Sequence, residues 1–179
     1  SYKMKKFLMA TAATALMAGG ALAESHGGKE VKLGVLLGFT GPIESTVANM
    51  APAAHLAMKE VSDSGKLLGG MTVTGIDGDS TCIDSAAATS AAERLITSDG
   101  VKGIIGGDCS GVTGAVLNNV ALPNGIVMIS PSATSPGLSH MNNEDNGLFF
   151  RTAPSDARQG EVMSDIRMDR GLKEVAVTY

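Results

Sequence analysis

Short apolar runs alternate with amphipathic stretches along most of the chain. Residues 31–37 are apolar apart from one lysine and one glycine, which is typical of a central parallel strand covered on both faces. Further strands are predicted at 71–76, 101–105, 125–129, 147–151 and from 174. Apolar residues at helical spacing predict helices at 50–64, at 86–98, from about 110 and at 156–170. This order predicts an α/β fold, a Rossmann-like parallel sheet flanked by helices with right-handed crossovers.

Individual residues indicate where three of the helices should begin. Pro52 has no backbone N–H and is tolerated only in a first turn, so the first helix should start near residue 50. Ser110 would lie at or near the N-cap of the third helix. In the last helix, Asp156 and Gln159 resemble a capping pair. Its buried side should carry Met163 with Ile166.

The first 23 residues have the pattern of an export signal. Three lysines, at positions 3, 5 and 6, precede an apolar, alanine-rich run, and an A-x-A site follows at 21–23. We therefore expect a secretory signal peptide that is cleaved after Ala23, followed by a polar tether at residues 24–30. A transmembrane anchor is the alternative, but the apolar run is short and is interrupted by threonines and glycines.

The charge of the chain limits its partners. The full sequence has a formal net charge of −4, and removing a segment with three lysines and no acid gives −4 − 3 = −7. Such a balance argues against nucleic acid or an anionic membrane surface as a partner. The 156 residues left after removal of 23 from 179 are enough for one domain with its own core.

Two loops rich in hydroxyl groups leave neighbouring predicted strands at the same edge. One is Gly106–Gly111, which holds Asp108 and Ser110, and the other is Ser130–Pro136. In an open parallel sheet, small ligands bind in the crevice beyond the carboxyl ends of the strands. A helix N-terminus at that edge offers N–H groups and partial positive charge to a carboxylate.

The two cysteines, Cys82 and Cys109, are the only ones in the chain, and each follows a predicted strand at this edge. An even count in an exported protein favours a disulfide. The alternative is a reactive thiol at Cys109, whose pKa a helix N-terminus would lower. That chemistry needs a histidine base, and only His55 and His140 are available.

Other site chemistries have weaker patterns. The glycines around 38–41 do not form G-x-G-x-x-G, so a nucleotide site is not supported. Asp77, Asp79 and Asp84 suggest calcium, but the twelve-residue loop with its final glutamate is missing. Ser110 lacks the G-x-S-x-G elbow of a hydrolase nucleophile. His55 has no second histidine at metal spacing and is interpreted as a solvated helix residue.

The loop sequences GGDCSGVTG and VMISPSATSP resemble the ligand-binding loops of periplasmic leucine/isoleucine/valine-binding proteins of ABC transporters. The resemblance extends from residue 31 to 179 and is supported by GVLLGFTGP, DSTCIDS and FFRTAPSDARQG. It implies that residues 31–152 are the first lobe of a type I periplasmic binding protein. Residues 153–179 would then be the hinge crossing and the truncated start of a second lobe.

The resemblance also implies a function and a site. The chain would be a monomeric, periplasmic, non-enzymatic receptor without cofactor or metal, which captures an amino acid for an ABC permease. Ser110 and the backbone of Thr134 would hold the ligand carboxylate. The Ser132 carbonyl and the Thr134 hydroxyl, with Ala133 between them, would accept hydrogen bonds from its ammonium. The resemblance also implies a disulfide bridge between the two loops that hold Cys82 and Cys109.

Three residues of the candidate pocket carry alternatives. Phe39 and Thr46 are pocket candidates whose other role is turn chemistry. Asp108 stands where the branched-chain binders usually have an apolar residue. If Asp108 faces the pocket, a polar or basic ligand or an amide becomes plausible.

A ligand-sensing receptor of the same fold remains an alternative to transport, and so does a secreted hydrolase, although no convincing nucleophile and base are visible.

Overall fold

The computed structural model describes residues 29–139 and 145–176. The predicted signal peptide, most of the tether and His140 lie outside this part of the chain. In chain order, the elements are β1 (Glu30–Leu37), α1 (Glu44–Asp63), β2 (Thr72–Asp79), α2 (Ser85–Thr97), β3 (Gly103–Gly106), α3 (Ser110–Val116), β4 (Val127–Ser130), β5 (Phe149–Arg151) and α4 (Asp156–Asp169). Short helical turns lie at Leu67–Gly69, Leu117–Ala121 and Pro136–Ser139.

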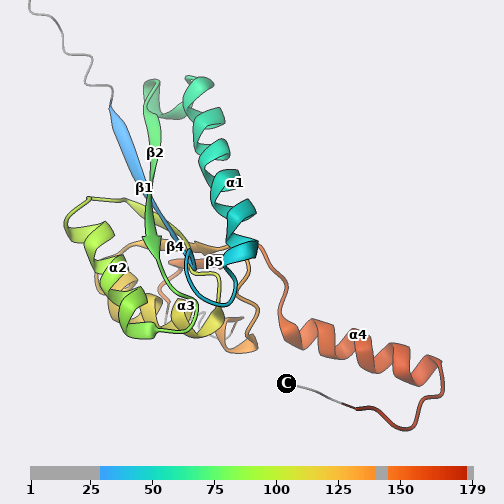
Figure 1. Cartoon of the computed structure of the whole chain (residues 1–179). Coiled ribbons are helices and arrows are strands. Elements are labelled where there is room, and N and C mark those ends of the chain that lie inside the picture. The colour runs from blue at the N-terminus through green and yellow to red at the C-terminus, as the bar shows by residue number, and fades with distance from the viewer. Residues whose placement is uncertain (1–28, 140–144, 177–179) are drawn as a thin grey trace, which may run out of the picture.

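The five strands form one parallel sheet in the order β2-β1-β3-β4-β5, which confirms the predicted α/β fold. Helices cover the sheet on both faces, with α1 on one side and α2 and α3 on the other (Figure 1). Alternate residues of β1 therefore enter different cores. Leu36 packs with α2 and α3, whereas Val35 and Leu37 pack with α1.

The face that α1 covers is protected only over part of its width. Val35, Ile105, Ile129 and Phe150 form one continuous row across β1, β3, β4 and β5. Val35 is fully buried beneath α1, but Ile129 is 42% exposed and Phe150 is 54% exposed. On this face of the sheet, the apolar side chains of β4 and β5 are thus not covered by a helix, which is unusual in a parallel sheet.

The first helix begins earlier than the sequence predicted. It starts at Glu44, so Pro52 lies in its interior and the expectation of a first-turn proline is wrong. Pro52 cannot donate to the carbonyl of Ala48, which weakens the helix locally. Val47 and Ala51 lie in this early part of the helix and are buried against the sheet. Burial of the helix face therefore outweighs the missing hydrogen bond.

The two predicted caps fare differently. Cys109 is the N-cap of α3 and makes no side-chain cap, and Ser110 follows it as the first helical residue, near the N-cap as predicted. Ser155 is the N-cap of α4, where its hydroxyl accepts from the N–H of Ala157 at 3.2 Å. The cap of α4 is therefore a serine and not the expected pair of Asp156 and Gln159. Both Ser110 and Asp156 have other contacts, which are described below.

Helix α4 extends away from the sheet, to which an extended segment connects it (Figure 1). It has no buried residues, and Met163 and Ile166 are 60% and 41% exposed. The apolar face that these two side chains mark is therefore exposed in the structure. Residues 174–176 are not in a strand, and residues 177–179 lie outside the described ranges. Among the helices described, none is both long and apolar enough to cross a membrane.

Candidate functional site

The carboxyl ends of β1, β2, β3 and β4 meet at one edge of the sheet. Parallel pairing in register places Leu37 opposite Asp79, Leu36 opposite Gly106, and Ile105 opposite Ile129. The loops that follow these strands therefore lie together, as the sequence predicted. We call these loops, at residues 38–43, 80–84, 107–109 and 131–135, the ligand edge.

A disulfide joins two loops of the ligand edge. Cys82 and Cys109 are bonded, with their Cα atoms 5.2 Å apart, which confirms the disulfide. Their loops follow β2 and β3, and β1 lies between these two strands in the sheet. The bridge thus passes beside the end of β1, where a side chain on Gly38 would meet Cys82 at 3.4 Å. The reactive-thiol alternative for Cys109 is not compatible with this bond.

Asp108 points into the protein. It is only 3% exposed. One carboxylate oxygen accepts from the Gly38 N–H at 2.5 Å. The other accepts from the Ser80 hydroxyl and from the Cys109 N–H, each at 3.0 Å. Its backbone carbonyl accepts from the Ser132 hydroxyl at 2.9 Å. Asp108 therefore connects all four loops of the ligand edge, and its carboxylate does not face the pocket, contrary to one expectation from the sequence.

Asp79 makes a second link between loops at this edge. Its carboxylate accepts from the Thr40 hydroxyl at 2.6 Å and from the Thr81 N–H at 2.8 Å. Burial raises the pKa of Asp79, but the hydrogen bonds from Thr40, Thr81 and the Phe39 backbone outweigh burial, so this pKa lies below its ordinary value. The loop after β1 also closely approaches the loop after β2. A Cβ on Gly41, whose φ is +101°, would lie 2.4 Å from the Thr81 carbonyl oxygen.

Ser110 connects the loop after β3 to the loop after β4. Its hydroxyl oxygen accepts from the Thr134 N–H at 3.2 Å and from the Ser135 N–H at 3.1 Å. Two incoming donors occupy the lone pairs of this oxygen, so its own proton is directed toward another acceptor. Ser110 is therefore prepared to donate a hydrogen bond, as binding of a carboxylate requires. The Thr134 N–H, which was expected to meet that carboxylate, is bound to Ser110 instead.

Thr134 is also in contact with the start of α4. Its hydroxyl donates to a carboxylate oxygen of Asp156 at 3.0 Å, and its carbonyl accepts from the Asp156 N–H at 2.9 Å. A cavity of about 350 Å³ opens beside this pair. The lining of the cavity includes Thr134, Asp156, Val162 and Met163. The candidate ligand residue Thr134 thus faces open space between its loop and α4.

Hydrogen bonds from Arg151 fix the backbone of the loop after β4. Its guanidinium donates to the carbonyls of Ala133 at 3.2 Å and Ser135 at 2.8 Å. The side chain of Ala133 is buried, and its N–H donates to the Ser130 hydroxyl at 2.9 Å. Ala133 therefore supports the loop. The Ser132 carbonyl has no hydrogen-bond partner among residues 29–139 and 145–176.

Phe39 lies in the loop after β1, and Thr46 lies in α1. Phe39 lines a different cavity of about 410 Å³ between α1 and β2, together with His55 and Asp77. Thr46 is exposed in the first turn of α1. In the same region, Nε2 of His55 lies 2.8 Å from the Asp77 carboxylate. His55 is thus paired with an acid from β2, a contact that the sequence analysis did not foresee.

The three aspartates considered for calcium have separate roles. Asp77 contacts His55, Asp79 binds Thr40, and Asp84 caps α2 by accepting from the N–H groups of Ala86 and Ala87. No group of three histidine, cysteine or acidic side chains within residues 29–139 and 145–176 is arranged to hold a metal ion.

Sequence reasoning missed Asp156 and Arg151 as residues that contact the ligand edge. Asp156 was interpreted only as a helix cap, and it lies 22 positions from Thr134 in the sequence. Arg151 was included only as the end of a short strand. The segment RTAPSD gave one signal, because an arginine and an aspartate flank a predicted crossing next to the hydroxyl-rich loops.

A family model described as periplasmic binding protein matches residues 30–179. A Leu/Ile/Val-binding protein homolog of Brucella melitensis is 30% identical over 151 residues, which are 84% of this chain and 39% of the relative. The leucine-specific-binding protein of Salmonella typhimurium is 30% identical over 142 residues, or 78% of this chain and 37% of that protein. The chain thus spans less than half the length of these curated relatives.

Solved structures show the same fold. The substrate-binding protein LivJ of Streptococcus pneumoniae, in complex with isoleucine, is 28% identical with a TM-score of 0.63, over 72% of this chain and 35% of that one. A solute-binding protein of Rhodopseudomonas palustris, in complex with 3,4-dihydroxybenzoic acid, is 22% identical with a TM-score of 0.67, over 80% of this chain and 37% of that one. At that identity, the second likeness supports the fold alone.

Proposed function

Because the chain belongs to the family of periplasmic binding proteins, we propose that it is the ligand-binding part of an exported receptor that captures an α-amino acid for an ABC importer. Residues 31–152 form the first ligand-binding lobe, and residues 153–179 begin the crossing to a second lobe. The first 23 residues act as the cleaved export signal, which agrees with a periplasmic location. The protein acts as a binding protein with a membrane permease as its partner, and it catalyses no reaction.

One observation carries this proposal, namely the pairing of two hydroxyl groups at the ligand edge. Ser110 follows β3, Thr134 follows β4, and the Thr134 N–H donates to the Ser110 oxygen. The Ser110 proton is available to a carboxylate. The Ser132 carbonyl, which has no hydrogen-bond partner in the described part of the chain, lies two positions before Thr134 and is a suitable acceptor for an ammonium. A donor beside an acceptor matches the carboxylate and the ammonium, which every free α-amino acid carries on its Cα atom.

The rigid frame around these groups supports the same proposal. The disulfide and Asp108 hold the loops that carry Ser110 and Ser132, and Arg151 holds the loop of Thr134 from behind. Since few of these groups must be ordered when a ligand arrives, less free energy is lost on binding. The LivJ structure with isoleucine and the leucine-specific relative make an aliphatic amino acid the first ligand to test.

The test is calorimetry on the full-length exported protein with each of the twenty standard L-amino acids. Ser110→Ala should weaken binding of the best ligand by about tenfold or more, because a hydrogen bond to a charged group contributes about 1.5–3 kcal/mol. Ser98→Ala, an exposed serine at the C-terminal end of α2, is the matched control and should bind like the wild type. If the protein binds none of the twenty amino acids, the proposed function is refuted. Unchanged affinity in Ser110→Ala would move the carboxylate site elsewhere.

A further inference from the structure

The proton of the Thr134 hydroxyl has a fixed direction in the structure. A hydroxyl carries one proton, and an ionised carboxylate only accepts hydrogen bonds. The 3.0 Å contact between Thr134 Oγ1 and Asp156 Oδ2 must therefore be donated by Thr134. What remains on this hydroxyl is lone-pair density. While the contact with Asp156 is kept, Thr134 acts toward a ligand only as an acceptor.

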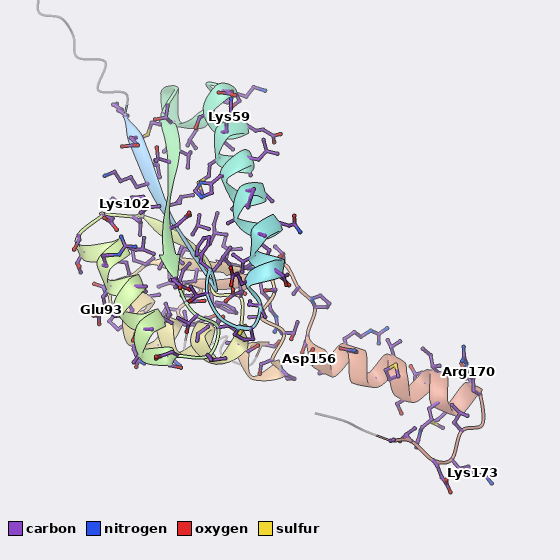
Figure 2. All side chains as sticks on the ribbon, in the orientation of Figure 1. Lys59, Glu93, Lys102, Asp156, Arg170 and Lys173 are labelled. Atoms are coloured by element: carbon purple, nitrogen blue, oxygen red, sulfur yellow. A yellow bond between two sulfur atoms is a disulfide. The ribbon has the colours of Figure 1, made fainter. Side chains whose placement is uncertain are left out.

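The contact is reinforced by a second one. The Asp156 N–H donates to the Thr134 carbonyl at 2.9 Å, so the two residues are joined through both backbone and side chain. Figure 2 shows Asp156 at the end of α4 nearest the sheet, with Arg170 at the far end. Of the cations near this end, Arg158 is occupied by Glu161 at 3.0 Å. The negative charge of Asp156 thus faces Thr134 and the 350 Å³ cavity.

We propose that Asp156 is a positioning residue that sets the Thr134 hydroxyl as an acceptor and thereby selects ligands with a cationic amine over the same acids without one. The inference rests on the proposed function, and it adds a residue from the crossing segment to the specificity of the site. Ser110 and Thr134 then have opposite polarity. The first has its oxygen occupied and offers a proton, and the second has its proton occupied and offers an oxygen.

This polarity predicts which ligands are rejected. An acid without an amine places a C–H group or a hydroxyl where the ammonium would lie. A C–H group leaves the Thr134 oxygen without a donor once water has been excluded, which costs binding free energy. An ammonium satisfies that oxygen, and it is also attracted by the carboxylate of Asp156 behind it. Asp156 should therefore affect amine recognition and leave carboxylate recognition at Ser110 largely intact.

The experiment compares two probes, L-leucine and 4-methylpentanoate, which is leucine without its amine. If another amino acid binds more tightly in the panel above, that amino acid and its deaminated acid are used. Calorimetry on the full-length protein should show that Asp156→Ala weakens leucine binding by about tenfold. Binding of 4-methylpentanoate should change by less than about threefold, so that the preference for the amine is reduced. Asp156→Asn should fall between Asp156→Ala and the wild type, because an amide oxygen still accepts the Thr134 proton.

Two controls separate positioning from a purely structural role. Asp165→Ala removes the same charge from an exposed position on the same helix, and it should leave both affinities unchanged. In a Thr134→Val background, Asp156→Ala should weaken leucine binding much less than it does in the wild type, because only the direct attraction between Asp156 and the ammonium remains to be lost. Equal losses for both probes, or no loss for either, would overturn the role of Asp156 while leaving the function standing. A wild-type protein that binds neither probe nor any other amino acid would overturn both.

Discussion

Replacing Asp108 should show how strongly one buried carboxylate holds the ligand edge together. Its partners include the Gly38 N–H and the Ser80 hydroxyl, both of which are buried. Asp108→Ala leaves these two donors without an acceptor. At about 1.5–3 kcal/mol for each bond to a charged group, the loss is about 3–6 kcal/mol. The Cys109 N–H is not counted, because its contact is local in sequence. Such a loss is a large part of the 5–15 kcal/mol of an ordinary domain.

Asp108→Asn gives a graded version of the same change. With the amide oxygen at the position of Oδ1, the NH₂ group opposes the Gly38 N–H. With the amide reversed, the NH₂ group opposes the Cys109 N–H. In either orientation the side-chain NH₂ faces a backbone N–H, so two donors oppose each other, and we expect a loss of about 1–3 kcal/mol in the free energy of unfolding. The Ser80 hydroxyl can rotate to suit either orientation, whereas a backbone N–H cannot.

Equilibrium urea unfolding of the oxidised protein, with linear extrapolation, measures these losses. Asp63→Ala is the control, because its carboxylate forms an exposed pair with Lys59 on the surface of α1. It should cost less than about 0.5 kcal/mol. Hydrogen exchange at the Gly38 amide gives a local readout and should accelerate in Asp108→Ala. If Asp108→Ala costs no more than the control, and Gly38 remains protected, Asp108 is not what holds the loops.

Two further predictions concern the same edge. Non-reduced peptide mapping of the exported protein should find Cys82 linked to Cys109, and two free thiols would contradict this. The double variant Cys82→Ser/Cys109→Ser should lower the free energy of unfolding by about 3–4 kcal/mol, because the bond no longer restricts the loop closed by the 27-position separation in the unfolded chain. The pKa of Asp79 is lowered in the folded state, so its stabilisation is complete above the unfolded pKa of about 3.9 and is lost as the pH falls through the lower, folded value. Asp79→Asn should therefore be less stable than the wild type at pH 6, with a difference that shrinks as the pH falls below about 4; a constant difference down to pH 2 would disprove this origin.

Much of the architecture follows from local sequence pattern. Residues 31–37 and 86–98 became β1 and α2 with boundaries shifted by one residue, because their apolar spacing and the stop at Asp99-Gly100 act within the segment itself. The start of α1 could not be found in this way. Pro52 argues locally against an interior position, and only the burial of Val47 and Ala51 against the sheet overrides it.

The candidate site was predictable in its parts but not in the directions of its side chains. Ser110 and Thr134 were identified from their loops, and the structure brings them into contact. The Asp108 carboxylate points inward to the Gly38 N–H and the Ser80 hydroxyl, which are 70 and 28 positions away in the sequence, so no local pattern could predict its orientation. Asp156 was missed because its partner is distant in sequence and becomes close only when the crossing segment returns past the loop after β4.

The disulfide has a consequence for where the protein works. The strands that precede Cys82 and Cys109 are not neighbours in the sheet, so no strand pairing joins the two loops when the bond is absent, although Ser80 still donates to Asp108. In a reducing cytoplasm both thiols stay free and the two loops are not covalently joined, whereas in an oxidising compartment the disulfide forms. How firmly the loops of the ligand edge are fixed therefore depends on the redox state of the compartment. If the proposed function is right, reduced protein should bind its ligand less tightly than oxidised protein.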